Sequence, residues 1–165
     1  MKWVLLGLML SFISCDYYIV NPHHHTVGYI SKNEARGSAD FAPCFEERIF
    51  DYYYFREPAK YRYGKDSLRR YFQTHYDPGG IINDSGYITI RFVINCRGEA
   101  GRYKITELSL DYKEKKFNSK IVGQIFNLLQ SAKLWNPSLR GDIPRDSYIY
   151  YTFKIINGEL VEILP

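Results

Sequence analysis

Cysteines, membrane-length apolar runs and strongly basic stretches are all scarce in this sequence. It holds 3 cysteines in 165 residues, which excludes a disulfide-rich scaffold. The longest apolar stretch runs from Trp3 to Ile13. A helix of that length rises about 16 Å, whereas the hydrocarbon core of a bilayer is roughly 30 Å thick. This stretch is therefore too short to span a membrane as a helix.

The charge is too evenly balanced for a nucleic-acid-binding protein. The chain has 22 Lys and Arg against 18 Asp and Glu, a net charge of +4, which becomes +3 (21 against 18) when Lys2 is left out. The densest basic stretch, Lys113–Lys116, is interrupted by Glu114 and is typical of a solvated loop. We expect no nucleic-acid partner.

Motifs of known catalytic chemistry are also missing. The sequence contains no GxSxG, no HExxH, no phosphate-binding glycine loop and no Cys and His at a family spacing. Carboxylates such as Asp111 and Glu114 lie in polar stretches that solvent should surround. We therefore expect neither an enzyme nor a bound cofactor.

The N-terminus has the composition of an export signal. Lys2 precedes the apolar stretch, and the chain then reaches Phe12-Ile13-Ser14-Cys15, which resembles a bacterial lipobox. The resemblance implies a signal peptide over residues 1–14 and lipidation of Cys15, which would anchor the mature chain to a membrane. An ordinary signal peptide with an incidental cysteine is the alternative.

Residues 15–42 are expected to form a flexible tether. They show little hydrophobic periodicity and mix Pro, Gly, Ser, Asn and charged residues. His23, His24 and His25 lie in this stretch, but a closed metal site needs ligands that converge from more than one place. No partner motif accompanies the three histidines, so we predict no metal site.

Two cysteines and a tyrosine-rich stretch follow. Cys44 and Cys96 could form a disulfide in an exported chain, or could remain as two separate buried thiols. Residues 43–63 are aromatic without clean alternation, and we expect them to pack on the main domain. Tyr52, Tyr53 and Tyr54 belong to this segment, where packing is favoured over a stacking platform for sugar or peptide.

The remaining residues, 64–165, show periodicity typical of regular structure. The stretch GKDSLRRYFQTHY predicts a helix that Asp66 caps, with Leu68, Tyr71 and Phe72 on one stripe. From Tyr87 the pattern has period two and predicts a strand, with one face formed by Ile88, Ile90, Phe92, Ile94 and Cys96.

A hairpin and a second helix are expected next. Residues 103–110 should return as a strand, and a change of phase predicts a bulge or a twist near Thr106. Asn118 or Ser119 should cap a helix with an apolar stripe formed by Ile121, Ile125, Leu128, Leu129 and Ala132.

A final hairpin completes the expected fold. Tyr148 to Ile156 alternate as a third strand, Asn157-Gly158 is a strong hairpin-turn signal, and Glu159 to Leu164 should return as a fourth strand. The sequence thus predicts an α+β domain, with a small antiparallel sheet of three to four strands packed against two helices.

The ordered pattern over residues 64–165 resembles the C-terminal domain of the TonB family. The resemblance consists of an Asn-ended strand, a Gly turn, a return strand, a helix, and a Trp followed by a Pro- and Gly-containing loop before a last strand. The matching positions are Phe92, Val93, Asn95, Gly98, Trp135, Pro137, Gly141, Pro144 and Phe153. An energy-transducing TonB also has a membrane-spanning helix and a long Pro-rich spacer, whereas this chain has the lipobox-like end and scattered prolines.

The resemblance implies a binding module, because domains of this family bind partners by adding an extended peptide to a sheet edge. The expected edge is the terminal strand, or Tyr148–Ile156 if that strand is displaced. The candidate binding residues are Tyr148, Tyr150, Glu159, Leu160, Val161 and Glu162. Glu159 and Glu162 could equally serve to guard the edge against aggregation.

We expect a lipoprotein of the cell envelope that faces the periplasm from the inner or outer membrane. Its expected partners are an envelope protein or an extended peptide, together with the membrane through the lipid. The alternative is a structural or self-associating envelope protein, a possible homodimer, whose contact surface is the tyrosine-rich stretch Ile49 to Phe55.

Overall fold

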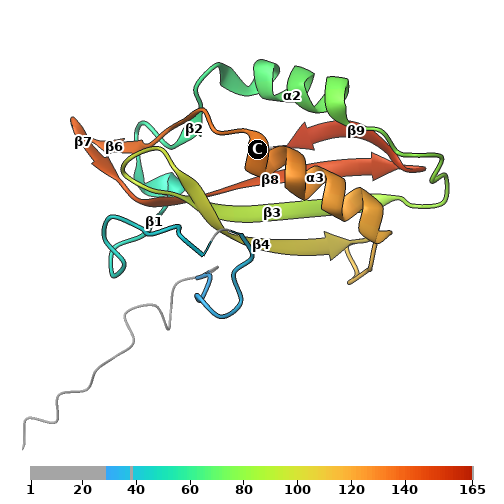
Figure 1. Cartoon of the computed structure of the whole chain (residues 1–165), viewed down its shortest axis with the longest axis horizontal. Helices are drawn as coiled ribbons and strands as arrows, with labels where there is room; N and C mark the ends of the chain where they lie inside the picture. Colours follow the sequence, from blue (N-terminus) through green and yellow to red (C-terminus); the bar gives the residue numbers. More distant parts are fainter. Residues whose placement is uncertain (1–28, 38, 165) are drawn as a thin grey trace, which may run out of the picture.

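The computed structural model describes residues 29–37 and 39–164. In this part of the chain two α-helices and nine strands form one mixed α+β unit (Figure 1). The helices are α2 (Gly64–His75) and α3 (Ser119–Ser131), and η1 (Tyr52–Tyr54) is a 3-10 turn. The strands are β1 (Phe50–Asp51), β2 (Lys60–Tyr61), β3 (Gly86–Ile94), β4 (Ala100–Leu108), β5 (Trp135–Asn136), β6 (Ser138–Arg140), β7 (Ile143–Arg145), β8 (Ser147–Ile156) and β9 (Glu159–Leu164).

The main sheet is built on β8 and β3. Its order is β1-β8-β3-β4, and β9 also pairs with β8. The α+β prediction is confirmed at this level, but the sheet has five strands instead of three to four. The additional strand is β1, which pairs with β8 in parallel over two residues only. A two-residue strand has no readable period, so the sequence could not predict it.

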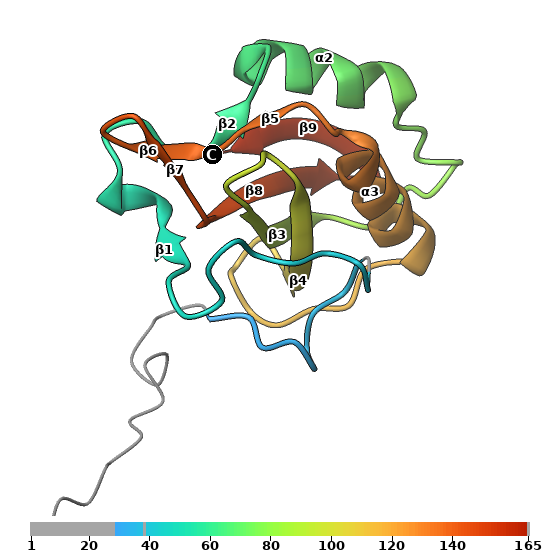
Figure 2. The same cartoon turned by 60° about the vertical axis from the view of Figure 1, so that its left-hand side comes forward.

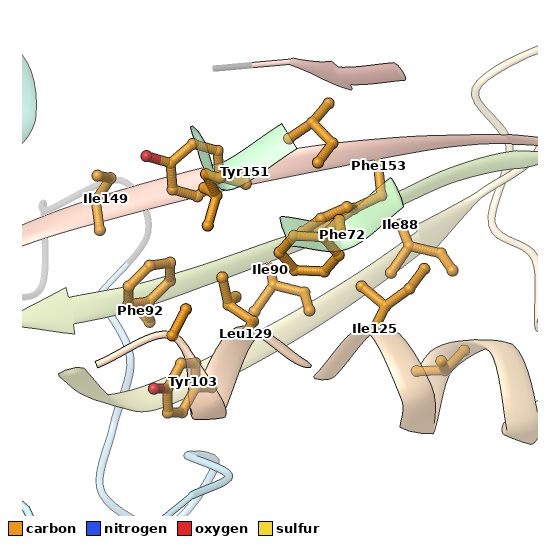
Figure 3. Packing of buried hydrophobic residues seen from close by; sticks show 14 of the residues in the cluster. Phe72, Ile88, Ile90, Phe92, Tyr103, Ile125, Leu129, Ile149, Tyr151 and Phe153 are labelled. Atoms are coloured by element: carbon orange, nitrogen blue, oxygen red, sulfur yellow. The ribbon is translucent and has the colours of Figure 1, made fainter. Parts of the chain in front are cut away.

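The helices cover one face of the main sheet and an N-terminal segment covers part of the other (Figure 2). Alternate residues of β3 and β8 point toward the helices because side chains along a strand alternate between its faces. Figure 3 shows this layer, in which Phe72 of α2 and Leu129 of α3 pack over Ile90 and Phe153. The predicted inward set of β3 is confirmed for Ile88, Ile90, Phe92 and Ile94.

The bulge of the β3–β4 hairpin lies at a different place from the predicted one. The register shifts between Arg91 and Val93, opposite Arg102, and not near Thr106. Arg102 has a φ of 55°, so the extra residue is accommodated by a left-handed backbone. The bulge turns Tyr103 into the main core and leaves Arg102 on the opposite face. A bulge near Thr106, one of the two predicted alternatives, was therefore wrong.

Both predicted helices form. α3 begins as expected, because the side chain of Asn118 accepts a hydrogen bond from the amide of Lys120. α2 begins at Gly64, with Tyr63 at the cap position, so Asp66 lies inside the first turn and is not the cap. A carboxylate in the first turn still stabilises the helix, because it lies near the positive end of the helix dipole.

Trp135 anchors the segment after α3. Its indole is 2% exposed and lies against the rings of Tyr61, Phe92 and Tyr151. This contact joins the short β2–β5 ladder to the main sheet. The next residues form the β6–β7 hairpin at one end of the molecule (Figure 1).

The turn between β8 and β9 has the predicted geometry. Asn157 and Gly158 both have positive φ angles, 51° and 82°, which suit the right-handed twist of the hairpin. The amide of Gly158 donates to the carbonyl of Asp84 at 2.7 Å, and the Tyr76 hydroxyl donates to the Gly158 carbonyl at 2.6 Å. The last hairpin is thus fixed to two preceding loops, and its predicted strands are confirmed.

Residues 29–37 and 39–49 pack on the face of the main sheet opposite the helices, and we call them the N-terminal strap. Ile30 and Ile49 of the strap form a second small core with Val93 and Tyr148. Arg36 forms a bridge with Tyr103, so the strap also reaches the edge of β4. The tether predicted over residues 15–42 falls outside the described residues up to residue 28, and from Tyr29 onward the prediction is wrong. The tether prediction failed there because isolated apolar residues such as Ile30 carry no periodic signal.

The strap is joined to the end of β3 by a disulfide between Cys44 and Cys96, with Cα atoms 6.0 Å apart. The Asp146 carboxylate lies beside it, fully buried, and accepts the amide of Phe45 at 2.6 Å and that of Cys96 at 2.7 Å. The carbonyl of Ala42 accepts the Asn95 side-chain amide at 3.0 Å. We call these residues the disulfide junction.

Candidate functional site

The outer edge of β8 carries an interruption between its two partner strands. β1 pairs with Ser147 and Tyr148, and β9 pairs with Thr152 to Ile156. Among the described residues, no strand pairs with Ile149–Tyr151 on the side away from β3. We call this three-residue stretch the β8 gap.

The backbone N–H and C=O groups of Tyr150 point into the β8 gap. The carbonyl of Asp146, just before β8, accepts the amide of Phe50 at 3.1 Å. Along β8 the N–H and C=O groups of even-numbered residues therefore face β1 and β9. β8 runs beside β3 without a bulge from Ser147 to Ile155. The same alternation therefore turns the N–H and C=O of Tyr150 toward the gap, where they are open to an added strand.

A mainly apolar pocket of about 360 Å³ opens beside the β8 gap. One wall is formed by Tyr52 and by Pro58 and Ala59, and the other is formed by the gap residues Ile149, Tyr150 and Tyr151. The amide of Ala59 donates to the Ser138 hydroxyl oxygen at 2.7 Å, which fixes the wall to the β6–β7 hairpin. The pocket has room for one bulky apolar side chain.

Polar contacts hold Tyr52 and the preceding residue Asp51 on the sheet. The rings of Tyr52 and Tyr150 meet edge to face with centroids 5.6 Å apart, and a hydrogen bond between their hydroxyls raises the pKa of Tyr150. Arg91 forms an ion pair with the buried carboxylate of Asp51 in β1. The Tyr53 hydroxyl donates to Asp51 at 3.1 Å, and this hydrogen bond, with the negative charge beside it, raises the pKa of Tyr53 to about 12.

The predicted binding residues divide into two groups. Tyr150 lines the pocket, whereas Tyr148 is 1% exposed in the second core and its edge is occupied by β1. The side chain of Tyr148 therefore cannot meet a partner in this arrangement. Its phenol accepts a long hydrogen bond of 3.5 Å from the amide of Ile30 in the strap.

The other four predicted residues lie on β9, the free edge strand beyond the gap. Glu159, Val161 and Glu162 are exposed, and Leu160 packs partly against the main core. Only Ile163 of β9 is fully buried in the core cluster. β9 also lies close to Arg69 and Gln73 of α2, which border a shallow hollow with it.

Exposed tyrosines extend from the pocket along η1. Tyr53 and Tyr54 are 61% and 68% exposed, and their rings lie 4.6 Å apart. Ile49, the first residue of the predicted self-association stretch, is buried in the second core and is not part of this surface.

Two predictions concern residues that the structure does not describe. Cys15, the expected lipid acceptor, and the histidines His23, His24 and His25 lie outside the described residues. In the described part, Cys44, Cys96 and Asp146 form a group close enough to hold a metal ion, but their two sulfur atoms form the disulfide.

The β8 gap itself was not predicted from the sequence. It depends on where β1 ends and where β9 ends along β8, and on a wall from residues 52–59 that is far from β8 in the sequence. The nearest signal in the sequence was the aromatic segment of residues 43–63, which was expected to pack on the domain.

Nothing matched the chain when it was compared with protein-family models, with curated proteins and with solved structures. Neither of the two described helices is long and apolar enough to cross a membrane.

Proposed function

We propose that this chain is a lipid-anchored binding module of the cell envelope, of the TonB C-terminal type, which recognises an extended segment of a partner protein. It binds and does not catalyse. The lipidated Cys15 holds it on the periplasmic side of the inner or outer membrane. It does not transduce energy, because the apolar stretch before Cys15 is too short for a helix that could engage a motor in the membrane.

The observation that carries this proposal is the β8 gap. An extended peptide can hydrogen-bond to the N–H and C=O of Tyr150 as a short added strand, since unpaired edge groups favour strand addition. A bulky apolar side chain of the peptide then enters the pocket between Ala59 and Tyr151. The backbone contacts provide affinity and the pocket provides specificity. The resemblance of residues 64–165 to a family that binds in this way supports the same mode.

A peptide selection tests this proposal directly. The full chain, purified in detergent, is used to select binders from a displayed library of random peptides, and affinities are then measured by titration. Selected peptides should share a bulky apolar residue. Tyr52→Ala and Tyr150→Ala should weaken their binding about tenfold or more, because each removes one wall of the pocket.

Tyr112→Ala is the matched control. Tyr112 is a 71% exposed tyrosine that stacks on Tyr87, outside the residues that line the pocket. The substitution Tyr112→Ala should leave peptide binding unchanged. The proposal fails if no peptide is selected, or if the selected peptides bind equally well to all three variants while urea unfolding shows that the variants are folded.

A second function, self-association, is favoured by the exposure of Tyr53 and Tyr54. Such a pair of adjacent, exposed rings is a natural contact between two copies. Sedimentation of the full chain in detergent separates the two functions. A dimer that Tyr53→Ser converts to a monomer, with no peptide bound at the β8 gap, would favour this second function.

A further inference from the structure

The disulfide junction is linked by a short length of chain to one boundary of the β8 gap. Only the residues from Phe45 to Ile49 separate Cys44 from β1, and η1 with the pocket residue Tyr52 follows β1 directly. A change at Cys44 is therefore transmitted to β1 and Tyr52 without crossing the main core. Both cysteines are half-buried, so small reductants can reach the bond.

Apart from the disulfide, the strap is attached to the sheet by a small core and by polar contacts. Arg36 and Tyr103 exchange backbone hydrogen bonds at 2.8 and 2.9 Å, and Asp51 in β1 forms an ion pair with Arg91. The second core buries Ile30 and Ile49 against Val93 and Tyr148. β1 adds a two-residue ladder. An ion pair joins Glu46 of the strap to Arg102 at 2.7 Å. Because the second core is much smaller than the main core, the strap opens locally more easily than the main core, and a covalent link to the end of β3 suppresses that opening.

We propose that the Cys44–Cys96 disulfide is a redox switch that sets the length of the free β8 edge. In the oxidised chain β1 stays on Ser147 and Tyr148, and the gap is limited to three residues. In the reduced chain the strap opens more often, β1 leaves β8, and the free edge extends over Ser147–Tyr151. The role of this change in partner binding rests on the function proposed above.

The chemistry is thiol–disulfide exchange with a dithiol reductant. A thiolate of the dithiol attacks one sulfur of the Cys44–Cys96 bond, which gives a mixed disulfide and releases the other cysteine as a thiolate. The second thiol of the reductant then displaces the first cysteine. Two electrons and two protons reach Cys44 and Cys96, and the dithiol becomes a disulfide.

The junction also allows the bond to form again. The Asp146 carboxylate accepts the amides of Phe45 and Cys96 independently of the sulfur atoms. Asn95 and Arg97 both donate to the carbonyl of Ala42, at 3.0 and 3.1 Å. These contacts bring the two cysteines back together whenever the opened strap closes, so the switch is reversible.

Hydrogen exchange followed by mass spectrometry tests the switch. The full chain in detergent is compared with and without dithiothreitol. Reduction should speed amide exchange about tenfold or more in residues 45–52 and at Tyr148, whose amide faces β1. Exchange in α3 and in the central strand β3 should stay the same. Removal of the reductant and mild oxidation should restore protection.

The double variant Cys44→Ala/Cys96→Ala is the control, and it should show the reduced pattern whether or not dithiothreitol is present. The switch is refuted if reduction leaves residues 45–52 protected, or if protection falls equally in every element, since the bond would then stabilise the whole fold. These outcomes are read on the wild-type chain, so they hold even if the double variant does not fold.

Peptide binding is measured separately. Peptides selected on the oxidised chain should bind at least about threefold more weakly after reduction, because Tyr52 leaves the pocket wall. If no peptide binds in either state, the proposed function fails while the exchange experiment still decides the switch. If peptides bind equally in both states while exchange changes, the coupling to binding is refuted.

Discussion

Arg102 is a charged residue that the fold buries and then neutralises. Its side chain is 4% exposed, and two of its nitrogens donate to the two carboxylate oxygens of Glu46 at 2.8 and 2.7 Å. This hydrogen bonding from Arg102 holds the pKa of Glu46 below its ordinary value of 4.5. Because charged bidentate pairs are strong and a buried guanidinium needs a partner, Glu46 is a main attachment of the N-terminal strap.

Glu46→Gln should therefore lower the free energy of unfolding by about 1–3 kcal/mol near neutral pH. This loss is smaller than the loss for a fully buried pair, because the Glu46 side chain is 38% exposed and solvent weakens the interaction. In the wild-type chain this contribution is present above the ordinary pKa of 4.5 and is lost as the pH falls through the lower folded pKa. Urea unfolding at several pH values measures it.

Glu34→Gln is the matched control. Glu34 pairs with Lys104 at 3.5 Å, and both side chains are largely exposed. Its loss should change the unfolding free energy by less than about 0.5 kcal/mol. Equal effects of the two substitutions would contradict a special role for the Arg102 pair.

Buried tyrosines make the fold sensitive to alkali. Burial is the largest cause that raises the pKa values of Tyr76, Tyr103 and Tyr151 from 10.0 to about 12. These tyrosines ionise at a lower pH in the unfolded chain than in the folded chain. Their contribution to the free energy of unfolding is therefore fully present below pH 10 and is lost as the pH rises toward 12. Urea unfolding between these pH values should show the decline, and Tyr103→Phe should make it shallower. A decline that is identical in this variant would contradict the assignment to Tyr103.

At the scale of secondary-structure elements, the β8–β9 hairpin depends on the glycine at its turn. Gly158 has a φ of 82°, and a Cβ atom there would collide with the carbonyl oxygen of Ile81. Gly158→Ala should cost about 3 kcal/mol, the sum of a left-handed backbone and an overpacked contact. Thermal or urea unfolding measures this cost.

Gly141→Ala is the control for the backbone effect alone. Gly141 also has a positive φ, 64°, but a Cβ atom there would meet nothing within 4 Å. We expect a loss of about 1 kcal/mol, clearly smaller than that of Gly158→Ala. Similar losses at the two positions would show that the Ile81 contact relaxes at little cost.

At the scale of the whole molecule, one hydrophobic core joins the helices, the main sheet and the short ladders. Trp135 contacts aromatic rings from β2, β3 and β8, so it connects three elements that are far apart in the sequence. Trp135→Ala should lower the free energy of unfolding by about 3–5 kcal/mol. That is a large part of the total stability of a typical domain.

Leu134→Ala provides the comparison, because this neighbour is 37% exposed. Its loss should cost less than about 1 kcal/mol. The two variants differ by one position in the chain, so a similar loss for both would mean that Trp135 does not hold the core together. Guanidinium or urea titration at neutral pH measures both.

The sequence by itself determined the elements that have a readable period. The alternation of Ile88, Ile90, Phe92 and Ile94, the cap at Asn118 and the turn at Asn157-Gly158 each reflect local backbone and side-chain geometry, which operates over a few residues. These local rules also predicted two helices and the last two strands. Their limits show at α2, which begins two residues before the expected cap at Asp66.

Only the tertiary structure decided the features that depend on distant residues. The bulge at Arg102 forms because Tyr103 packs in the main core while Arg102 meets Glu46, which is 56 positions away. The β8 gap exists because β1 and β9 stop at different points along one strand, and its pocket needs residues from two parts of the chain. Such pairings are set by packing and by closure of the chain in three dimensions, and they leave no period in the sequence.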